Sequence, residues 1–308
     1  MHTIPVKRVA ILVHGFAGKT GFMKEIEETL RVEPFNQIYD SVSNISYYDS
    51  KHGIDFSRPY DLKTPIFDKN SKQTLAHNLF NKISAEIFDC KENVFLDIFA
   101  HSMGGLVIRA MIKYLLMVEK QEKQNGIWIN NGLIQNIYLL GTPNRGTHLA
   151  QRLIMIPADI LISGLNFALE IPRQGITKED FTIMNSQFMQ MVPNASFLKD
   201  LNKRQKDLDK SINWVTVKGL NSGGILGIAW QPFLFRKFWL NRHFPFLHKG
   251  MIPNDGVVDA DSVPLKHATN LTVPKATHMD LLKWKSKKSG QTVLKLLKPH
   301  ILASKEKS

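Results

Sequence analysis

Residues 94–105 read Val94-Phe-Leu-Asp-Ile-Phe-Ala-His-Ser-Met-Gly-Gly105, and this stretch decides the fold. The first six residues are apolar except for Asp97, which is typical of a strand that is buried on both faces of a sheet. The residues from 106 to about 119 predict a helix. A turn of small residues, with Ser102 at its centre, therefore joins a buried strand to a helix.

The same alternation of strands and helices continues on both sides of this turn. Further strands are predicted at residues 9–13, 41–47, 134–140, 212–218 and 269–273. Helices are predicted at residues 22–30, 74–88 and about 290–297, and the polar, proline-containing stretch 49–69 is predicted to be a loop. This order indicates an α/β fold with a mainly parallel central sheet and helices on both faces.

The alternation breaks between residues 149 and 250, where only the strand at 212–218 stands out. We interpret this region as a cap or lid inserted into the core, with one predicted core strand within it. The core would then consist of residues 1–148 and 251–308. A core followed by an inserted subdomain suits a chain of 308 residues.

Two stretches of the predicted insertion are strongly apolar. Residues 153–169 carry a single charge, and residues 228–247 place many aromatic side chains beside Arg236, Lys237 and Arg242. Aromatic rings beside cations suit a lipid–water interface, so the insertion could form a lid that opens there. The alternative is that both stretches form the core of the cap itself.

The small residues around Ser102 predict a reactive serine. A nucleophilic serine between a strand and a helix projects from a strained turn, so the positions two before and two after it must be small. Here they are Ala100 and Gly104, and Gly105 leaves the helix room to pack. The N-terminus of the helix favours negative charge beside the serine. The alternative is a buried serine in an ordinary strand–helix turn.

Two segments of the sequence resemble motifs of a known protein family. Ala100-His-Ser-Met-Gly-Gly105 resembles the nucleophile turn of bacterial triacylglycerol lipases, and Val13-His-Gly-Phe-Ala-Gly18 is similar to the segment that follows their first core strand. The resemblance covers roughly residues 5–150 and 250–285. It implies the α/β-hydrolase fold and a serine hydrolase that cleaves carboxylic esters, above all acylglycerol lipids, through an acyl-enzyme.

Alternative activities stay open at this stage. The same machinery would serve a short-chain carboxylesterase, a phospholipase or an acyl-thioesterase. A non-enzymatic alternative is a lipid-binding protein on an inactive hydrolase scaffold. The cap, rather than the core motifs, would decide between these substrates, because specificity resides in the parts that surround the reacting atoms.

Acyl transfer also requires two N–H groups that stabilise the oxyanion. Met103, directly after Ser102, supplies one in this type of turn. The resemblance assigns the second to the backbone N–H of Phe16. The main alternative is that Gly18-Lys19-Thr20 ends a phosphate-binding loop, but the first glycine of such a loop is missing, because Val13 stands there.

The general base is expected in a loop before the last helix. In this fold the chain order is nucleophile, acid, histidine. His278 has the expected position after the last strand. The competing histidines are His243 and His248, in the insertion, and His267, before the last strand.

The acid that orients the base is expected shortly before it. Asp255 opens the segment Asp-Gly-Val-Val, 23 residues before His278, while Asp259 and Asp261 are alternatives. Asn-Asp-Gly is also a common turn sequence, so a purely structural role for Asp255 stays open. The lipase family carries Asp-Gly-x-Val at its catalytic acid, and this resemblance favours Asp255.

No metal or cofactor is expected. His278-Met-Asp280 resembles a pattern in which some of these lipases bind calcium through the aspartate. Calcium needs several oxygen ligands, and no Asp or Glu occurs between Asp209 and Asp255 to supply a partner. No cluster has the spacing of a zinc site either.

Composition limits the partners and the compartment. The net charge of +13 includes many lysines after residue 282, and no nucleic-acid-binding motif accompanies it. We expect the charge to favour solubility first and contact with anionic lipid second. The lone Cys90 excludes an internal disulfide and suits a reducing compartment. No signal peptide is recognisable, so the expected location is the cytoplasm, with association at a membrane surface as an option.

Overall fold

The computed structural model of the chain describes residues 6–16, 20–48, 74–88, 93–122, 132–154, 187–203, 212–220 and 253–303. Six strands form one sheet in the order β2-β1-β3-β4-β5-β6, and every neighbouring pair is parallel. The strands are β1 (Val6–Val13), β2 (Ser41–Ile45), β3 (Asn93–His101), β4 (Ile134–Leu140), β5 (Asn213–Leu220) and β6 (Thr269–Pro274).

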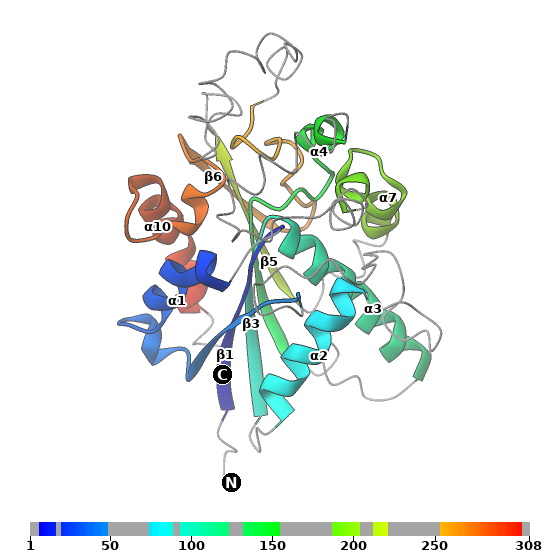
Figure 1. The fold of residues 1–308 in the computed structure, drawn as a ribbon. Helices are drawn as coiled ribbons and strands as arrows, with labels where there is room; N and C mark the ends of the chain where they lie inside the picture. Colours follow the sequence, from blue (N-terminus) through cyan, green and yellow to red (C-terminus); the bar gives the residue numbers. More distant parts are fainter. Residues whose placement is uncertain are drawn as a thin grey trace, which may run out of the picture.

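Helices lie on both sides of this sheet (Figure 1). The helix α1 (Lys24–Leu30), preceded by the 3₁₀ turn η1 (Thr20–Met23), lies on one side together with α10 (Lys288–Leu302). The helices α2 (Leu75–Phe88), α3 (Met103–Glu122) and α7 (Ser196–Lys203) lie on the other side. Short elements complete the described part: η2 (Phe35–Gln37), α4 (His148–Leu153) and η5 (Asp280–Leu282).

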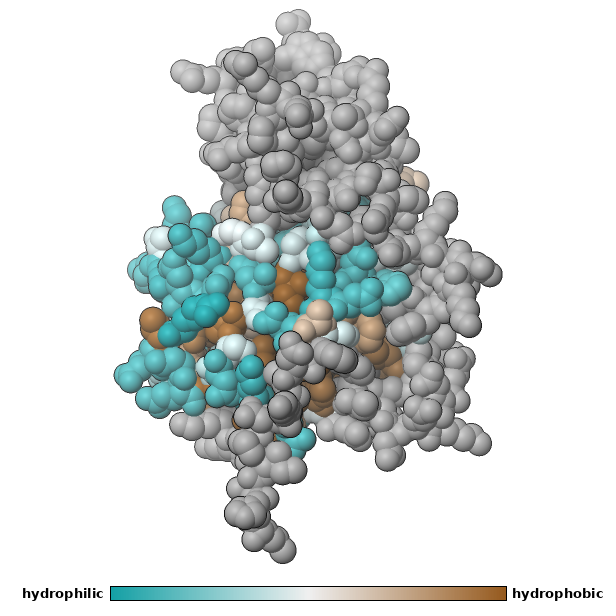
Figure 2. All heavy atoms as spheres, turned by 60° about the horizontal axis from the view of Figure 1, so that its bottom comes forward, coloured by the Kyte–Doolittle hydropathy of each residue, from teal (hydrophilic) through white to brown (hydrophobic). Residues whose placement is uncertain are grey.

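The alternation of side chains along each strand produces two hydrophobic cores. In β1, Val9, Ile11 and Val13 pack into the core that includes residues of α2 and α3. Ala10 and Leu12 point to the opposite core, which includes residues of α1 and α10. Both faces of β1 are covered, as expected of a central parallel strand. On the described surface in Figure 2, hydrophilic residues lie around smaller apolar areas.

A buried polar cluster lies on the face of the sheet that packs against α1 and α10. The Arg8 guanidinium is 3.5 Å from the Asp97 carboxylate, which also accepts hydrogen bonds from the Tyr39 hydroxyl (2.9 Å) and from Asn136 Nδ2 (2.6 Å). Burial raises the pKa of Asp97, although the hydrogen bonds and Arg8 oppose this shift. The one polar residue in the apolar run of β3 therefore has a structural role.

The boundaries differ from the sequence-based expectation in a few places. The helix α3 begins at Met103 rather than Leu106, because the turn at Ser102 leads directly into it. The strand β2 ends at Ile45 rather than Tyr47. The helix α10 is longer than predicted, and the helix α7 was not predicted.

The strand expected within the insertion is present as β5, between β4 and β6. The two apolar stretches lie almost entirely outside the described residues, as does the loop predicted at 49–69, so the division into core and cap remains a proposal. Among the helices that the structure describes, none combines the length and the apolar character needed to cross a membrane.

Candidate active site

Ser102 occupies a strained turn at the carboxyl end of β3. Its φ of 53° lies in the left-handed region, which is unfavourable for a residue with a side chain. The turn is held because Ser102 N–H donates to the Leu140 carbonyl (2.8 Å) and Gly105 N–H donates to the Ser102 carbonyl (3.1 Å). Strain of this kind persists only where the surroundings enforce it, and it is characteristic of functional sites.

The loop that follows β1 packs closely against the turn at Ser102. A Cβ atom placed on Gly104 would lie 2.2 Å from the His14 carbonyl oxygen. Because that neighbour is backbone, it cannot move aside without displacing the end of β1. The small residue two positions after Ser102 is therefore required by close contact between two loops.

His278 and Asp255 form a buried pair. His278 Nδ1 lies 2.7 Å from Asp255 Oδ2, and the two side chains are 7% and 1% exposed. A second link joins their backbones, because His278 N–H donates to the Asp255 carbonyl (2.8 Å). A carboxylate on Nδ1 fixes the ring orientation and leaves Nε2 as the nitrogen that can accept a proton.

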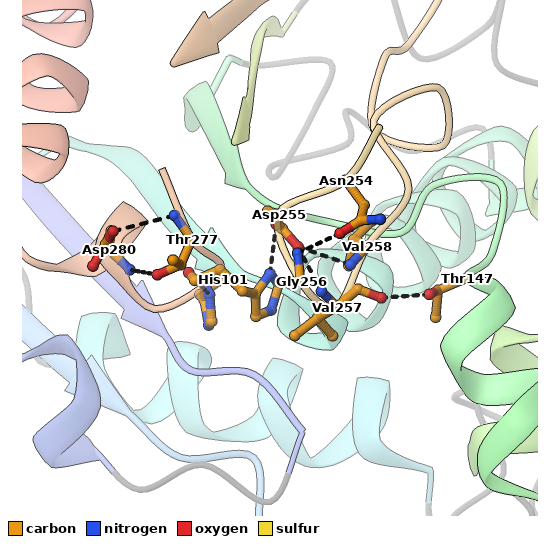
Figure 3. Close-up of polar contacts among 10 residues, drawn as sticks. His101, Thr147, Asn254, Asp255, Gly256, Val257, Val258, Thr277 and Asp280 are labelled. Carbon is orange, nitrogen blue, oxygen red and sulfur yellow. Dashed lines mark hydrogen bonds and ion pairs between the residues drawn. The ribbon is translucent and has the colours of Figure 1, made fainter. Parts of the chain in front are cut away.

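The other oxygen of Asp255 is held by its own loop (Figure 3). Oδ1 accepts the N–H groups of Val257 (3.0 Å) and Val258 (2.8 Å), while Gly256 N–H donates to Asn254 Oδ1 (2.7 Å). Both carboxylate oxygens are therefore satisfied, and the carboxylate cannot rotate without breaking these bonds. Asp255 thus both stabilises the Asn-Asp-Gly turn and contacts His278.

Ser102 and the His278 ring both approach the carboxyl end of β4. Leu140 accepts the Ser102 N–H, and a Cβ on the next residue, Gly141, would lie 3.0 Å from both Cε1 and Nδ1 of His278. Within the described residues no hydrogen bond joins Ser102 Oγ to His278. Such bonds are often long in an unliganded site and shorten when substrate binds.

His101 packs behind the base. Its ring centroid is 4.5 Å from that of His278, and its Nε2 lies 3.2 Å from the His278 carbonyl oxygen. A carbonyl can only accept, so Nε2 carries the proton. Burial, together with the positive charge that His278 can carry, holds the pKa of His101 well below its usual range. His101 is therefore a neutral donor that supports the His278 backbone.

The two expected oxyanion donors lie on either side of Ser102. Met103 is fully buried at the first position of α3, and Phe16 follows Gly15, where an added Cβ would lie 2.8 Å from Ser102 Cβ. The Phe16 ring packs on Phe188, with centroids 4.7 Å apart. In the described part of the chain, neither backbone N–H has an acceptor.

The alternative acids have other partners. Asp259 Oδ2 accepts the backbone N–H of His148 (2.9 Å) and lies 3.0 Å from His148 Nδ1, so it caps the start of α4. Asp261 contributes its backbone carbonyl to Arg145 Nη1 (3.3 Å). Neither of them contacts His278 in the structure.

The remaining candidates are not at this site or cannot be placed. His267 is exposed, whereas His243 and His248 lie outside the described residues, as do residues 17–19 of the possible phosphate loop. Asp280 accepts the Thr277 N–H (3.2 Å), and its own N–H bonds to Thr277 Oγ1 (3.2 Å; Figure 3). Within the described residues, no group of three or more His, Cys, Asp or Glu side chains could hold a metal.

Sequence reasoning assigned no role to several buried residues near the site. Arg109 is fully buried on α3 and donates to Asn144 Oδ1 (3.0 Å) and Asn202 Oδ1 (2.7 Å), which links α3 to the loop after β4 and to α7. Burial lowers the pKa of Arg109 to about 9. Arg109 lies seven positions, or about two helical turns, after Ser102. This spacing is the feature of the sequence that indicates an inward-facing side chain.

In its described residues, the chain has the fold of the α/β-hydrolases. Its structure is similar to the mature lipase BlEst2 of Bacillus licheniformis, with a TM-score of 0.52 and 16% identity over 97% of this chain and 94% of that one. It is also similar to the phospholipase PlaB of Legionella pneumophila, with a TM-score of 0.56 and 14% identity over 98% of this chain and 65% of that one. A third similar structure is the metagenomic carboxyl esterase MGS0156 (TM-score 0.52, 13% identity, 97% of this chain, 76% of that one).

A comparison with protein families matches part of the chain. The family described as "Putative serine esterase (DUF676)" matches residues 68–203, which include the Ser102 turn and α3. No curated protein matches the chain by sequence. The fold is thus that of the α/β-hydrolases, and residues 68–203 resemble the family described as "Putative serine esterase", which agrees with the resemblance to serine lipases and esterases.

Proposed function

We propose that the protein hydrolyses carboxylic esters, in the first place acylglycerol lipids, through an acyl-enzyme on Ser102. The observation that carries the proposal is the buried Asp255–His278 pair beside a serine with left-handed backbone geometry. A buried carboxylate on Nδ1 prepares His278 to remove a proton, and the strained turn presents the hydroxyl that would lose it.

In the proposed acylation step, Ser102 Oγ attacks the ester carbonyl carbon and its proton moves to His278 Nε2. The negative charge that develops on the carbonyl oxygen is stabilised by the N–H groups of Phe16 and Met103. The intermediate then collapses, the carbon–oxygen bond to the alcohol breaks, and His278 gives its proton to the leaving oxygen.

Deacylation repeats these roles with water. His278 removes a proton from a water molecule, which attacks the acyl carbon, and the same N–H groups stabilise the second oxyanion. The bond to Ser102 Oγ then breaks, and the proton on His278 returns to Ser102 as the carboxylic acid leaves. Every proton transfer runs between His278 and Ser102, the leaving alcohol or water, while Asp255 only orients His278, so the proposal includes no metal and no cofactor.

The substrate class rests on the two apolar stretches of the proposed cap, which is formed by residues 149–250 apart from the core strand β5. An apolar lid that opens at an interface suits water-insoluble acyl chains, and a net charge of +13 would favour adsorption to anionic lipid. Among the similar structures are a lipase, a phospholipase and a carboxyl esterase. A phospholipase, a short-chain carboxylesterase and an acyl-thioesterase are the alternatives.

Replacement of the nucleophile tests the reaction. The variant Ser102→Ala should lose turnover of a p-nitrophenyl ester while its thermal unfolding remains cooperative, and wild type should be labelled stoichiometrically by a fluorophosphonate where the variant is not. Undiminished turnover in Ser102→Ala would contradict the proposal. A folded wild type that neither turns over esters nor reacts with the probe would favour a lipid-binding protein on an inactive scaffold.

A further inference from the structure

The carbonyl oxygen of Gly15 accepts two buried hydrogen bonds that the proposed chemistry does not use directly. His14 Nδ1 lies 2.8 Å from this oxygen, and the Tyr47 hydroxyl donates to it at 2.8 Å. Because a carbonyl can only accept, the proton of His14 is on Nδ1. Two donors from separate segments, the end of β1 and the loop after β2, thus converge on one oxygen atom.

This oxygen belongs to the same peptide unit as the Phe16 N–H. A trans peptide is planar, and its C=O and N–H bonds point in opposite directions. Donors that fix the Gly15 oxygen therefore also fix the direction of the Phe16 N–H. That N–H is the oxyanion donor in the proposed function, on which this inference rests.

The peptide needs such restraint because its first residue must be glycine. A Cβ on Gly15 would lie 2.8 Å from Ser102 Cβ and 3.1 Å from His101 Nδ1, so no larger residue fits. Glycine, however, lets the backbone rotate more freely than any other residue. The close approach to Ser102 therefore creates a flexible peptide at the position where the direction of an N–H matters most.

The His14 ring is itself held in one orientation and one tautomer. It stacks on Tyr47 with centroids 4.6 Å apart, and its Nε2 lies 2.9 Å from Ser46 Oγ, which can donate to it. Burial lowers the pKa of His14 to about 4, and the charge of Lys82 adds to this, against the hydrogen bond to Gly15. The ring is thus neutral at neutral pH, with its proton committed to the Gly15 oxygen.

The loop that carries Tyr47 is tied to α2. Lys82 Nζ donates to the carbonyl oxygens of Ser46 and Tyr48, each at 2.7 Å. These bonds flank Tyr47 on both sides, and the Tyr47 side chain is fully buried. The Tyr47 hydroxyl therefore has a fixed position relative to the sheet.

We propose that His14 and Tyr47 are positioning residues of the oxyanion site, which hold the Gly15–Phe16 peptide so that the Phe16 N–H faces the reacting carbonyl oxygen. They touch neither substrate nor Ser102 Oγ. Their effect passes through one peptide plane and should appear mainly in the transition state, where the oxyanion forms.

The variant Tyr47→Phe tests this directly, because it removes a single hydroxyl. Loss of an entire oxyanion donor lowers kcat by about 10²–10³-fold, so loss of one of two restraints should lower kcat about tenfold. KM should stay within about twofold, because the ground-state ester makes little use of the donor. A trifluoromethyl ketone, which forms a tetrahedral adduct with an oxyanion, should bind about tenfold more weakly.

The matched control is Tyr39→Phe. This variant also loses a buried hydroxyl that donates a hydrogen bond. The Tyr39 hydroxyl, however, donates to Asp97 on the opposite face of the sheet. The control variant should lower the unfolding temperature to a similar extent and leave kcat and ketone affinity unchanged. Equal losses of kcat in both variants would overturn the inference, because they would indicate general destabilisation.

A second pair of variants covers the case in which Tyr47→Phe folds poorly. His14→Asn and His14→Leu both remove the stacked ring and have similar size, but only asparagine can place an N–H where Nδ1 lies. The asparagine variant should retain several-fold more activity than the leucine variant. Equal activity in the two variants would overturn a positioning role for His14.

Labelling separates this inference from the proposed function. Wild type that reacts with a fluorophosphonate at Ser102, together with Tyr47→Phe of unchanged kcat and ketone affinity, would overturn the positioning role alone. Wild type that fails to react would overturn the proposed function and this inference with it.

Discussion

Asp255 and Asp259 lie four residues apart in one loop, and the structure gives them different partners. Asp255 is fully buried against His278 and the N–H groups of its own turn. Asp259 holds the first backbone N–H of α4 through its carboxylate. Sequence spacing alone cannot separate two aspartates this close, because both fall within the range that the fold allows for the acid.

The first prediction compares these two carboxylates. Asp255→Asn should lower kcat by up to about 10⁴-fold, because an amide that donates to Nδ1 favours the wrong tautomer of the base, as in serine proteases. Asp259→Asn is the matched control: the asparagine oxygen can still accept the His148 N–H, so kcat should stay near wild type. Steady-state kinetics on a p-nitrophenyl ester measure both. If Asp259→Asn suffers the larger loss, the assignment of the acid is wrong.

Glu25 joins the first helix to the segment that follows η5. Its carboxylate accepts the backbone N–H groups of Lys285 (3.0 Å) and Ser286 (3.1 Å) and the Ser286 hydroxyl (2.7 Å). Burial alone would raise the pKa of Glu25, but these hydrogen bonds and the nearby Lys283 outweigh it and lower the pKa from 4.5 to about 2. Two elements that are far apart in sequence thus share one anchor.

The second prediction concerns the pH dependence of this anchor. A carboxylate with a lowered pKa in the folded state stabilises the protein above its unfolded pKa and loses this effect as the pH falls through the folded value. Glu25→Gln should therefore lower the unfolding free energy at neutral pH. The difference from wild type should shrink between about pH 5 and pH 2, as followed by urea unfolding at several pH values.

The control for this measurement is Glu28→Gln on the same helix. Glu28 pairs with Lys285 Nζ at 3.2 Å, but both side chains are more than two-fifths exposed, and exposed ion pairs contribute little. Its unfolding free energy should stay close to wild type across the pH range. A pH-independent effect of Glu25→Gln would show that the glutamate acts through packing and not through its charge.

The elements also show where local pattern was sufficient. The strand β4 was predicted at its observed bounds, because an apolar run between polar segments has one reasonable interpretation. The helix α7 was missed, although Phe197, Leu198 and Leu201 are buried on one side of it. Eight residues are too short for periodicity to separate a helix from a loop, and packing on the core stabilises this helix.

At the scale of the whole molecule, the proposed site lies at one end of the sheet. Ser102 directly follows β3, and His14 directly follows β1. His278 lies after β6, and Asp255 lies in the loop before β6. In parallel sheets the carboxyl ends of the strands meet at one edge, so residues separated by more than 250 positions can serve one reaction. Substrate choice then depends on what covers this edge.

The third prediction concerns that choice. If the apolar stretches at 153–169 and 228–247 form a lid, the rate should favour medium and long acyl chains and should rise when the substrate aggregates. A series of p-nitrophenyl esters and emulsified glycerides, assayed below and above the aggregation concentration, tests this. A sharp preference for acetate or butyrate esters without such a rise would indicate a plain carboxylesterase, with both stretches packed as cap core.

The sequence by itself predicted the parallel sheet and the turn at Ser102, because apolar runs, small residues and local order carry this information directly, and its resemblance to lipases implied the α/β-hydrolase fold. It also predicted Asp255 as the acid and His278 as the base. The tertiary structure alone decided that they bond to each other, that Asp259 caps α4, and that His14 and Tyr47 converge on the Gly15 oxygen. Local pattern fixes which element a residue joins, whereas the contacts between distant loops depend on how strands of different length and register bring their ends together.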